Sequence, residues 1–333
     1  MSVVVKPIAI YYEHPDWFRP LFEELDRRSV PYVRIDASRH QYDPSAIANE
    51  YALFFNRMSA SAYLRGHANA IFHTRNFLKH LERTGTRVLN GTEAFSIETS
   101  KALQLGLLAS LGLPYPRTRV INNAAEAVNA ARELQFPVVV KPNIGGRGAG
   151  IVRYESMESL ARSAEAGLVE LGIDSTALVQ EYIPVRGGHI NRVETLNGKY
   201  LYAIKVFTSG ASFNLCPAEI CQTEDGVTAA GEMCLADAPP AGLKVEVFRP
   251  PAEVIEAVER IAEAARMDMG GIEYLLDERD GALLYYDINA LSNFVADAPR
   301  LLGFDPHARL VDYVLEEAKR CATATGSRFS VVG

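Results

Sequence analysis

The chain has 333 residues, of which 48% are hydrophobic and 23% charged, and its formal charge is −7. This length predicts two or three packed units rather than one small core. The negative charge is spread without a basic run, which argues against a nucleic-acid partner. The apolar runs, such as residues 136–140, are far shorter than the roughly 20 residues of a membrane span. The N-terminus has no secretory pattern, so we expect a cytoplasmic protein.

Residues 1–93 predict an open α/β unit, because strand-like runs alternate with helical patterns. The expected strands and helices are at residues 7–12, 15–28, 31–37, 51–57, 68–84 and 87–90. Strands in this order form a parallel sheet, and ligands bind at the carboxyl ends of such strands. Arg57 ends the third strand and is therefore a candidate substrate contact, with a solvated strand-end arginine as the alternative.

Residues 94–184 predict a helix followed by a small α/β unit. An apolar stripe at helical spacing indicates one helix over 96–111. The strands and helices that should follow are at residues 123–134, 136–142, 151–154, 156–171 and 177–183, with Ser156 as an N-cap.

Residues 185–333 predict mainly antiparallel structure. Asn197–Gly198 joins strands at 189–196 and 199–207, and Asn-Gly is the strongest short hairpin signal. A second antiparallel pair, turned at Asp280–Gly281, is expected from the pattern of the residues around it. The remaining elements are expected at residues 251–266, 271–277, 282–290 and 306–319.

A glycine-rich segment follows the strand that carries Lys141. Its glycines include Gly145, Gly146 and Gly148, and Arg147 lies at its tip. Backbone N–H groups of such a loop can surround phosphate oxygens, because glycine permits close approach and positive φ. The segment is neither a Rossmann nor a Walker motif. A flexible β-turn without a ligand is the alternative.

Lys101 lies at the start of the Leu-rich helix, where the helix dipole disfavours a structural cation. A lysine there is consistent with an anionic ligand that the helix N-terminus also attracts. The alternative is a solvated surface lysine.

A candidate metal site is formed by Glu273, Asp287 and Asn289 on two strands expected to pair. Asp287 and Asn289 are two residues apart, so they share one face of their strand. Carboxylate and amide oxygens are the hard ligands that Mg²⁺ prefers. Buried acids in apolar strands are costly unless they are paired or bind a metal.

Residues 179–184 form a strand that ends at Glu181 before an extended linker. The backbone from Glu181 to Ile183 is therefore placed to pair with the edge of a planar ligand. The cysteines Cys216, Cys221, Cys234 and Cys321 lack a familiar zinc spacing, and we expect free thiols.

Taken in order, these motifs resemble the ATP-grasp superfamily, and its RimK-like carboxylate–amine ligases in particular. The resemblance spans about residues 90–303, with glutathione synthetase and D-alanine–D-alanine ligase as more distant relatives. It implies an α/β (α+β) ATP-grasp fold with three units: an N-terminal pre-ATP-grasp domain at 1–93, a connecting helix with the ATP lid at 94–184, and a C-terminal subdomain at 185–333.

The resemblance also implies roles for individual residues. Lys101, Lys141 and the glycine loop would contact ATP phosphates, and Lys205 would lie against the nucleotide or the acyl phosphate. The metal residues would hold one or two Mg²⁺ ions, with Mn²⁺ as an alternative. The nucleotide-binding set would be completed by Gln180, Glu181, Tyr182, Ile183 and His189.

The chain departs from the RimK-like pattern at three places. A ribose-side acid is replaced near His189, although Arg192 still matches the arginine of that pattern. Val206 replaces an active-site arginine beside Lys205. The segment after Asn289 reads Leu-Ser-Asn-Phe rather than Ser-Pro-Gly, which alters the substrate pocket around Asn293. Arg57, Arg192 and Arg300 are candidate carboxylate anchors.

The resulting hypothesis is an ATP-dependent ligase that joins a carboxylate to an amine through an acyl phosphate. The substrates would be small molecules or a peptide, and family analogy suggests a homodimer. Two alternatives remain: a nucleotide-binding module without ligase activity, and a kinase that acts on a small acid.

Overall fold

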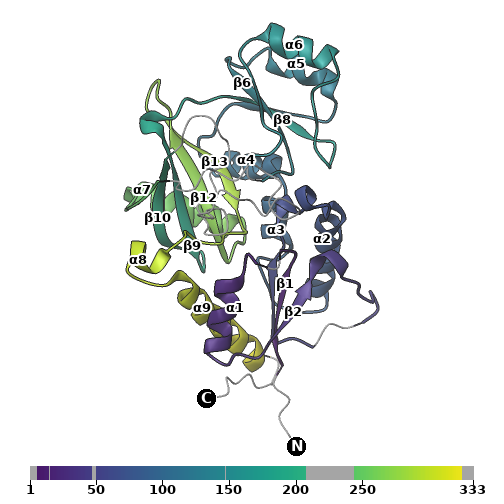
Figure 1. Ribbon diagram of the computed structural model, residues 1–333, viewed down its shortest axis with the longest axis vertical. Coiled ribbons are helices and arrows are strands. Elements are labelled where there is room, and N and C mark those ends of the chain that lie inside the picture. Colours follow the sequence, from purple (N-terminus) through teal and green to yellow (C-terminus); the bar gives the residue numbers. More distant parts are fainter. Residues whose placement is uncertain (1–5, 15, 47–49, 147, 208–243, 325–333) are drawn as a thin grey trace, which may run out of the picture.

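The computed structural model describes residues 6–14, 16–46, 50–146, 148–207 and 244–324. The strands in this part of the chain form three sheets, two of four strands and one of five. Figure 1 shows the five-stranded sheet between the two smaller units, with the unit around β6 (Val138–Pro142) and β8 (Ala177–Glu181) at one end of the molecule. The mixture of parallel and antiparallel sheets confirms the expected fold class.

The N-terminal sheet is parallel, with the order β2-β1-β3-β4. Alternating side chains of β1 and β3 pack against α1 on one face and α2 on the other. Phe18 precedes α1, which begins four residues later than the pattern predicted. The bounds are β1 (Ile8–Tyr12), α1 (Arg19–Arg27), β2 (Tyr32–Asp36), β3 (Leu53–Arg57), the 3₁₀ turn η2 (Ala60–Arg65), α2 (Ala68–Arg83) and β4 (Val88–Leu89).

The prediction of a single helix over 96–111 is wrong. The structure has α3 (Thr92–Glu98) and α4 (Lys101–Ser110), with a break at Thr99 and Ser100. Ser100 adopts extended backbone angles, and its hydroxyl accepts a hydrogen bond from the N–H of Leu103. This N-cap starts a new helix at Lys101.

The small sheet has the order β5-β8-β6-β7, and α5 and α6 cover one of its faces. Ser156 is the N-cap of α6, as the sequence predicted. It also forms a capping box with Ser159, which was not predicted. The helix ends at Glu165 rather than near residue 171. The bounds are β5 (Thr118–Ile121), α5 (Ala127–Ala131), β6 (Val138–Pro142), β7 (Val152–Tyr154), α6 (Met157–Glu165) and β8 (Ala177–Glu181).

The large sheet is antiparallel, with the order β11-β10-β9-β12-β13. It includes both predicted hairpins, and α7 covers one face. The bounds are β9 (His189–Leu196), β10 (Lys199–Phe207), β11 (Val245–Phe248), α7 (Ala252–Ala264), β12 (Met269–Leu276), β13 (Leu283–Asn289), α8 (Ala298–Leu302) and α9 (Pro306–Ala324).

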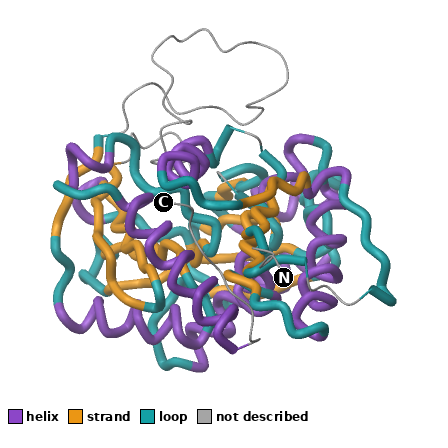
Figure 2. Tube along the Cα trace, turned by 90° about the horizontal axis from the view of Figure 1, so that it is seen from below, coloured by secondary structure: helices purple, strands orange, loops and turns teal. Residues whose placement is uncertain are grey.

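The C-terminal helix α9 returns to the N-terminal unit and lies beside α1 (Figure 1). Arg28, just after α1, donates to Asp312 at 2.5 Å and to the carbonyl oxygen of Ala308 at 3.1 Å. Figure 2 shows helices along the outside of the strands. Among the described helices, none has the length and apolar character needed to cross a bilayer.

Candidate functional site

The hairpin of β12 and β13 brings the three candidate metal ligands together. Glu273 pairs with Asp287 across the two strands, and Asn289 pairs with Gly271. Directly paired residues of an antiparallel sheet share a face, so the three side chains project from the same face.

A β-bulge at Tyr286 adds a fourth group to this face. Glu273 pairs with Asp287 and Tyr274 pairs with Tyr285, so Tyr286 has no partner residue in β12. Its hydroxyl donates to Glu273 Oε2 at 2.6 Å. Bulges commonly redirect a side chain next to a functional site, and the sequence pattern gave no signal for this one.

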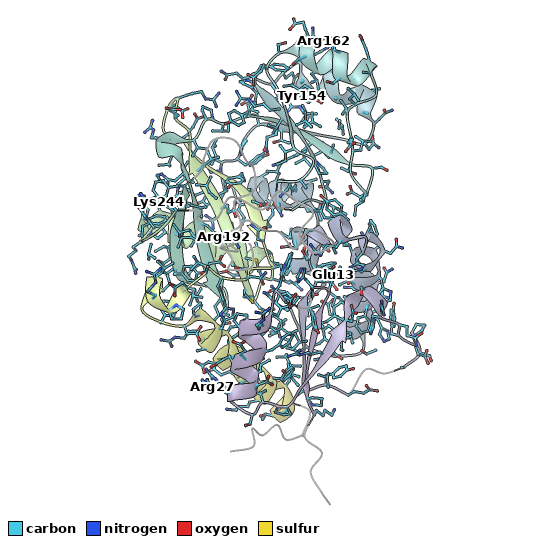
Figure 3. The ribbon with its side chains drawn as sticks, in the orientation of Figure 1. Glu13, Arg27, Tyr154, Arg162, Arg192 and Lys244 are labelled. Atoms are coloured by element: carbon cyan, nitrogen blue, oxygen red, sulfur yellow. The ribbon has the colours of Figure 1, made fainter. Side chains whose placement is uncertain are left out.

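Arg192 in β9 links the site to the neighbouring strand (Figure 3). Its guanidinium donates to Glu273 Oε1 at 2.9 Å and to Glu194 Oε1 at 2.6 Å. Gly271 makes room for it, because a Cβ there would lie 2.6 Å from Nη2 of Arg192. Arg192 is therefore held between two carboxylates.

Lys101, the first residue of α4, reaches Asp287 from another part of the chain. Its Nζ donates to Asp287 Oδ1 at 2.6 Å, and both side chains are largely buried. Burial opposes the charge on Lys101, but Asp287, Glu273 and Glu98 outweigh it and raise the pKa of the ammonium group. A solvated surface lysine does not describe this residue.

The two carboxylates respond differently to the same burial. Burial raises the pKa of Glu273, and the charge of Asp287 raises it further. Burial also opposes ionisation of Asp287, but Lys101 outweighs that effect and lowers the pKa. Lys101 therefore favours the ionised form of Asp287, whereas burial favours the protonated form of Glu273 against the opposing charge of Arg192.

Lys141 lies at the end of β6, on the small sheet, and is 6% exposed. Its Nζ donates to Gln180 Oε1 at 2.9 Å. Burial lowers the pKa of Lys141 to about 7, and the charge of Lys101 lowers it further while Asp287 opposes the shift. The two lysines thus come from separate elements, α4 and β6, to one electrostatic site.

The glycine loop lies against both Lys101 and the N-terminal unit. A Cβ at Gly145 would lie 3.9 Å from Cε of Lys101, and a Cβ at Gly146 would lie 3.0 Å from Cβ of Ser61. Gly148 and Gly150 have positive φ values of 74° and 73°. Arg147 lies outside the described residues, as do Cys216, Cys221 and Cys234.

The expected hinge at 181–183 has one available backbone donor. The N–H of Glu181 donates to the carbonyl of Arg117 at 3.0 Å, and that of Tyr182 to Pro137 at 2.9 Å. No hydrogen bond is recorded for the Ile183 N–H within the described part of the chain. The Glu181 carboxylate accepts from the N–H of Gln135 at 2.9 Å, so it links the end of β8 to the segment before β6.

The turn after Asn289 is held by side chains from several elements. Glu98 accepts from the N–H of Leu291 at 3.0 Å, and Arg192 donates to Ser292 Oγ at 3.2 Å. The Tyr202 hydroxyl accepts from the N–H of Val295 at 3.0 Å. We call residues 290–295 the clamped turn. Glu98 is the last residue of α3, three positions before Lys101, and no sequence pattern marks it.

Arg57 is part of this clamp. It is 3% exposed, donates to the carbonyl oxygen of Ser292, and donates to Asn293 Oδ1 at 3.1 Å. Burial lowers its pKa to about 9. The structure therefore brings Arg57 and Asn293 together, with the arginine buried between the N-terminal unit and the turn.

Three other sequence candidates lie away from the carboxylates. Lys205 neighbours Ile204, which pairs with Arg192, so alternation places Lys205 on the opposite face of the sheet. Its Nζ lies 5.6 Å from the ring centroid of Phe248. Arg300 is exposed and paired with Asp297. His189 begins β9, and its Nδ1 lies 3.1 Å from the carbonyl oxygen of Gly187.

The residues of the hairpin fit a hard divalent cation. The described part of the chain contains no cluster of three His, Cys, Asp or Glu side chains that could hold a metal. The hairpin instead offers two buried carboxylates and an amide. Among the described residues, Asp287 Oδ2 has only a long contact, 3.4 Å to Asn289 Nδ2, so this oxygen remains available to bind a metal ion. This donor set is typical of magnesium sites that leave other positions to water and phosphate.

Comparison with known proteins identifies the fold. Residues 98–214 match the family model of the RimK-like ATP-grasp domain. The structure of ATP-grasp ligase PsnB complexed with a phosphomimetic variant of minimal precursor, Mg and ADP is 18% identical, with a TM-score of 0.64. That comparison covers 95% of this chain and 100% of the PsnB chain. The fold is therefore ATP-grasp, and the resemblance seen in the sequence is confirmed.

Curated relatives match parts of the chain. The carbamoyl phosphate synthase large chain of Thermotoga neapolitana is 25% identical over 249 residues, which are 71% of this chain and 21% of that protein. A probable alpha-L-glutamate ligase of Teredinibacter turnerae is 30% identical over 139 residues, 41% of this chain and 45% of that protein. The chain spans about a fifth of the length of the first of these relatives.

Proposed function

We propose, from the ATP-grasp fold and the RimK-like match over residues 98–214, that this protein is an ATP-dependent carboxylate–amine ligase. The observation that carries the proposal is the convergence of Lys101 and Lys141 near the buried pair of Glu273 and Asp287. Two cations from α4 and β6 and two acids from the β12–β13 hairpin form one site, which suits a nucleoside triphosphate with its metal.

Each part of the site has a role in nucleotide binding. Lys101 and Lys141 bind phosphate oxygens, and Gly145 to Gly150 close over them. The Ile183 N–H is the donor for an acceptor nitrogen of adenine. Glu273, Asp287 and Asn289 would hold Mg²⁺, which when bound offsets negative charge on the phosphates.

The reaction has two displacement steps. A substrate carboxylate oxygen attacks the γ-phosphorus of ATP, the bond to the β-phosphate oxygen breaks, and ADP leaves. The amine then attacks the acyl carbon, the bond to the phosphate oxygen breaks, and phosphate leaves with the electron pair. The amine loses its proton to give a neutral amide. Closure of the glycine loop excludes water, which would hydrolyse the acyl phosphate.

The acceptor is a free amine or the amine of a peptide. The glutamate-ligase relative supports an amino-acid substrate, and the PsnB complex with a minimal precursor supports a peptide. The protein would act in the cytoplasm, and family analogy suggests a homodimer.

One experiment tests the ligase function. The full chain is incubated with Mg²⁺-ATP and a panel of amino acids, hydroxy acids and short peptides, with and without amines, while ADP is measured. Release that requires an acid and an amine together supports the ligase. Release with the acid alone, with an acyl phosphate that hydroxylamine traps, would instead identify a kinase.

A nucleotide-binding module without ligase activity is the second candidate. It is favoured by Lys205, which lies on the face opposite Arg192, and by Arg192 itself, which two carboxylates already hold. Tight ATP binding without ADP release under any substrate pairing would support this module and contradict the ligase.

A further inference from the structure

A row of hydrogen bonds crosses three neighbouring strands of the small sheet and ends at Lys141. Lys141 Nζ donates to Gln180 Oε1 at 2.9 Å, and Gln180 Nε2 donates to Thr118 Oγ1 at 2.8 Å. The Thr118 hydroxyl in turn donates to the carbonyl oxygen of Pro116 at 2.7 Å. The row runs from β6 through β8 to β5, which are adjacent in the sheet.

The strand register places the three side chains on one face. Thr118 pairs directly with Gln180, and Gln180 pairs with Val139. Lys141 is two residues beyond Val139, so it projects from the same face. This face is opposite the one that α5 and α6 cover, because the covered side holds Val138, Val140 and Val179.

The chemistry of the two ends fixes the direction of the row. The Pro116 carbonyl can only accept, and Lys141 Nζ, which carries N–H protons whether it is charged or neutral, donates to Gln180 Oε1. The single proton of the Thr118 hydroxyl goes to Pro116, so the hydroxyl oxygen must accept from the Gln180 amide nitrogen. The Gln180 carbonyl oxygen is then directed at Lys141. Without Thr118, the amide could rotate and direct its NH₂ group at the ammonium, where it cannot accept.

Burial makes this orientation important for Lys141. Gln180 is 5% exposed and Lys141 is 6% exposed, so water does not readily replace a lost partner. In the described part of the chain, Gln180 makes the only recorded hydrogen bond of the Lys141 ammonium. Lys101 and Asp287 also act on Lys141, but through charge rather than contact.

We propose that Thr118 is a positioning residue, which through the Gln180 amide holds the Lys141 ammonium in place for an anionic phosphate of the nucleotide. This inference rests on the proposed function, because it assumes that Lys141 binds phosphate. Thr118 itself begins the edge strand β5, and within the described part of the chain its side-chain hydrogen bonds are to Gln180 and Pro116 and not to either lysine. Gln180 then acts as the group that orients Lys141, in addition to any contact of its own with the nucleotide.

A double-mutant cycle on the full chain tests the proposal. The variants are Thr118→Val, Lys141→Met and the pair, with Thr118→Ser as the matched control that keeps the hydroxyl. The dissociation constants of Mg²⁺-ATP and of adenosine are measured by calorimetry. Adenosine has no phosphate, so its binding reports whether the lid and hinge are intact.

We expect Thr118→Val to weaken ATP binding about tenfold and leave adenosine binding within about twofold of wild type. Thr118→Ser should bind ATP like the wild type, and Thr118→Val should add nothing in the Lys141→Met background. The positioning role would be overturned if Thr118→Val weakened the binding of ATP and of adenosine equally. It would also be overturned if the effects of Thr118→Val and Lys141→Met on ATP binding were additive. Wild-type ATP affinity in Lys141→Met would instead remove Lys141 from the phosphate site, and absence of ATP binding by the wild type would overturn the proposed function.

Discussion

The ammonium group of Lys101 donates to the carboxylate of Asp287 across 2.6 Å, although 186 positions separate the two residues in the chain. This pair joins the start of α4 to the end of β13. It also sets the charge of the site before any nucleotide arrives, because the lysine offsets a buried acid. When phosphate and a metal ion bind, Lys101 can exchange the Asp287 carboxylate for a phosphate oxygen. Asp287 can exchange the ammonium group for the metal ion.

Replacement of Lys101 by Met leaves Asp287 buried without its cation. We expect a loss of about 3–5 kcal/mol in the free energy of unfolding, because an unpaired buried charge is costly. The double variant Lys101→Met/Asp287→Asn should lose less than the sum of the two single variants. Urea denaturation of the nucleotide-free protein measures this.

The matched control is Lys199→Met, which breaks the exposed pair with Glu259. Exposed pairs contribute little to stability, so this variant should unfold like the wild type. If Lys101→Met behaved like the control, Asp287 would not depend on Lys101.

Nucleotide binding should take up a proton near pH 8. Burial lowers the pKa of Lys141 to about 7, so most of the free protein carries a neutral lysine at that pH. Phosphate favours the ammonium form, and binding then draws a proton from the buffer. Calorimetry in two buffers of different ionisation enthalpy measures the uptake, and Lys141→Met should abolish it. Equal binding enthalpies in the two buffers would refute the shift.

The glutamate at the end of α3 should matter for the clamped turn. Glu98→Ala removes the acceptor for the Leu291 N–H, and an unsatisfied buried donor costs about 1–3 kcal/mol. Glu98→Gln keeps an acceptor oxygen and should lose less. Glu93→Ala, at an exposed position of the same helix, is the control. Chemical denaturation, with ADP release as a second readout, should show the largest loss of stability for Glu98→Ala. The loss should be smaller for Glu98→Gln and smallest for Glu93→Ala.

Much of the fold could be predicted from the sequence because local patterns and turn signals were consistent. The Asn197–Gly198 hairpin and the alternation in β9 and β10 agree with the structure. The break between α3 and α4 could not be read from the leucine stripe, because the residues of the stripe, from Ala102 to Leu111, all follow Ser100. The capping hydroxyl decides that boundary.

The candidate site could be predicted only where the spacing of residues along a strand determines which face they share. Asp287 and Asn289 share a face by their spacing, and pairing then adds Glu273. The clamp by Glu98 depends on a contact across 193 positions, which no periodicity reveals. Lys205 was placed by family resemblance, but the strand register sets its face. Whether it takes part in catalysis stays a prediction.

The protein should lose stability as the pH falls from about 6.5 towards 4. Burial lowers the pKa of His307 to about 4, with Asp305 opposing and Arg57 adding to the shift. Below pH 6.5 the unfolded chain therefore binds more protons than the native state, which favours unfolding. His307→Phe should reduce the loss of unfolding free energy between pH 7 and pH 5. An unchanged loss in that variant would show that His307 does not contribute.

The approach of the glycine loop to the N-terminal unit should depend on the small size of Gly146. A Cβ at this position would lie 3.0 Å from Cβ of Ser61, so one of the two groups must shift. We expect Gly146→Ala to weaken ATP binding several-fold and to increase ADP release without amide formation, because a displaced loop admits water to the acyl phosphate. Ser61→Gly removes the contacting atom. The double variant Ser61→Gly/Gly146→Ala should therefore bind ATP as tightly as Ser61→Gly alone.

The control for an added methyl group is Gly106→Ala in α4, where a Cβ would meet no atom within 4 Å. It should leave affinity unchanged and stabilise the helix by up to about 1 kcal/mol. If Gly146→Ala bound ATP and coupled ADP release to amide formation like this control, the loop would close without approaching Ser61. The contact between the loop and the N-terminal unit would then play no part in excluding water.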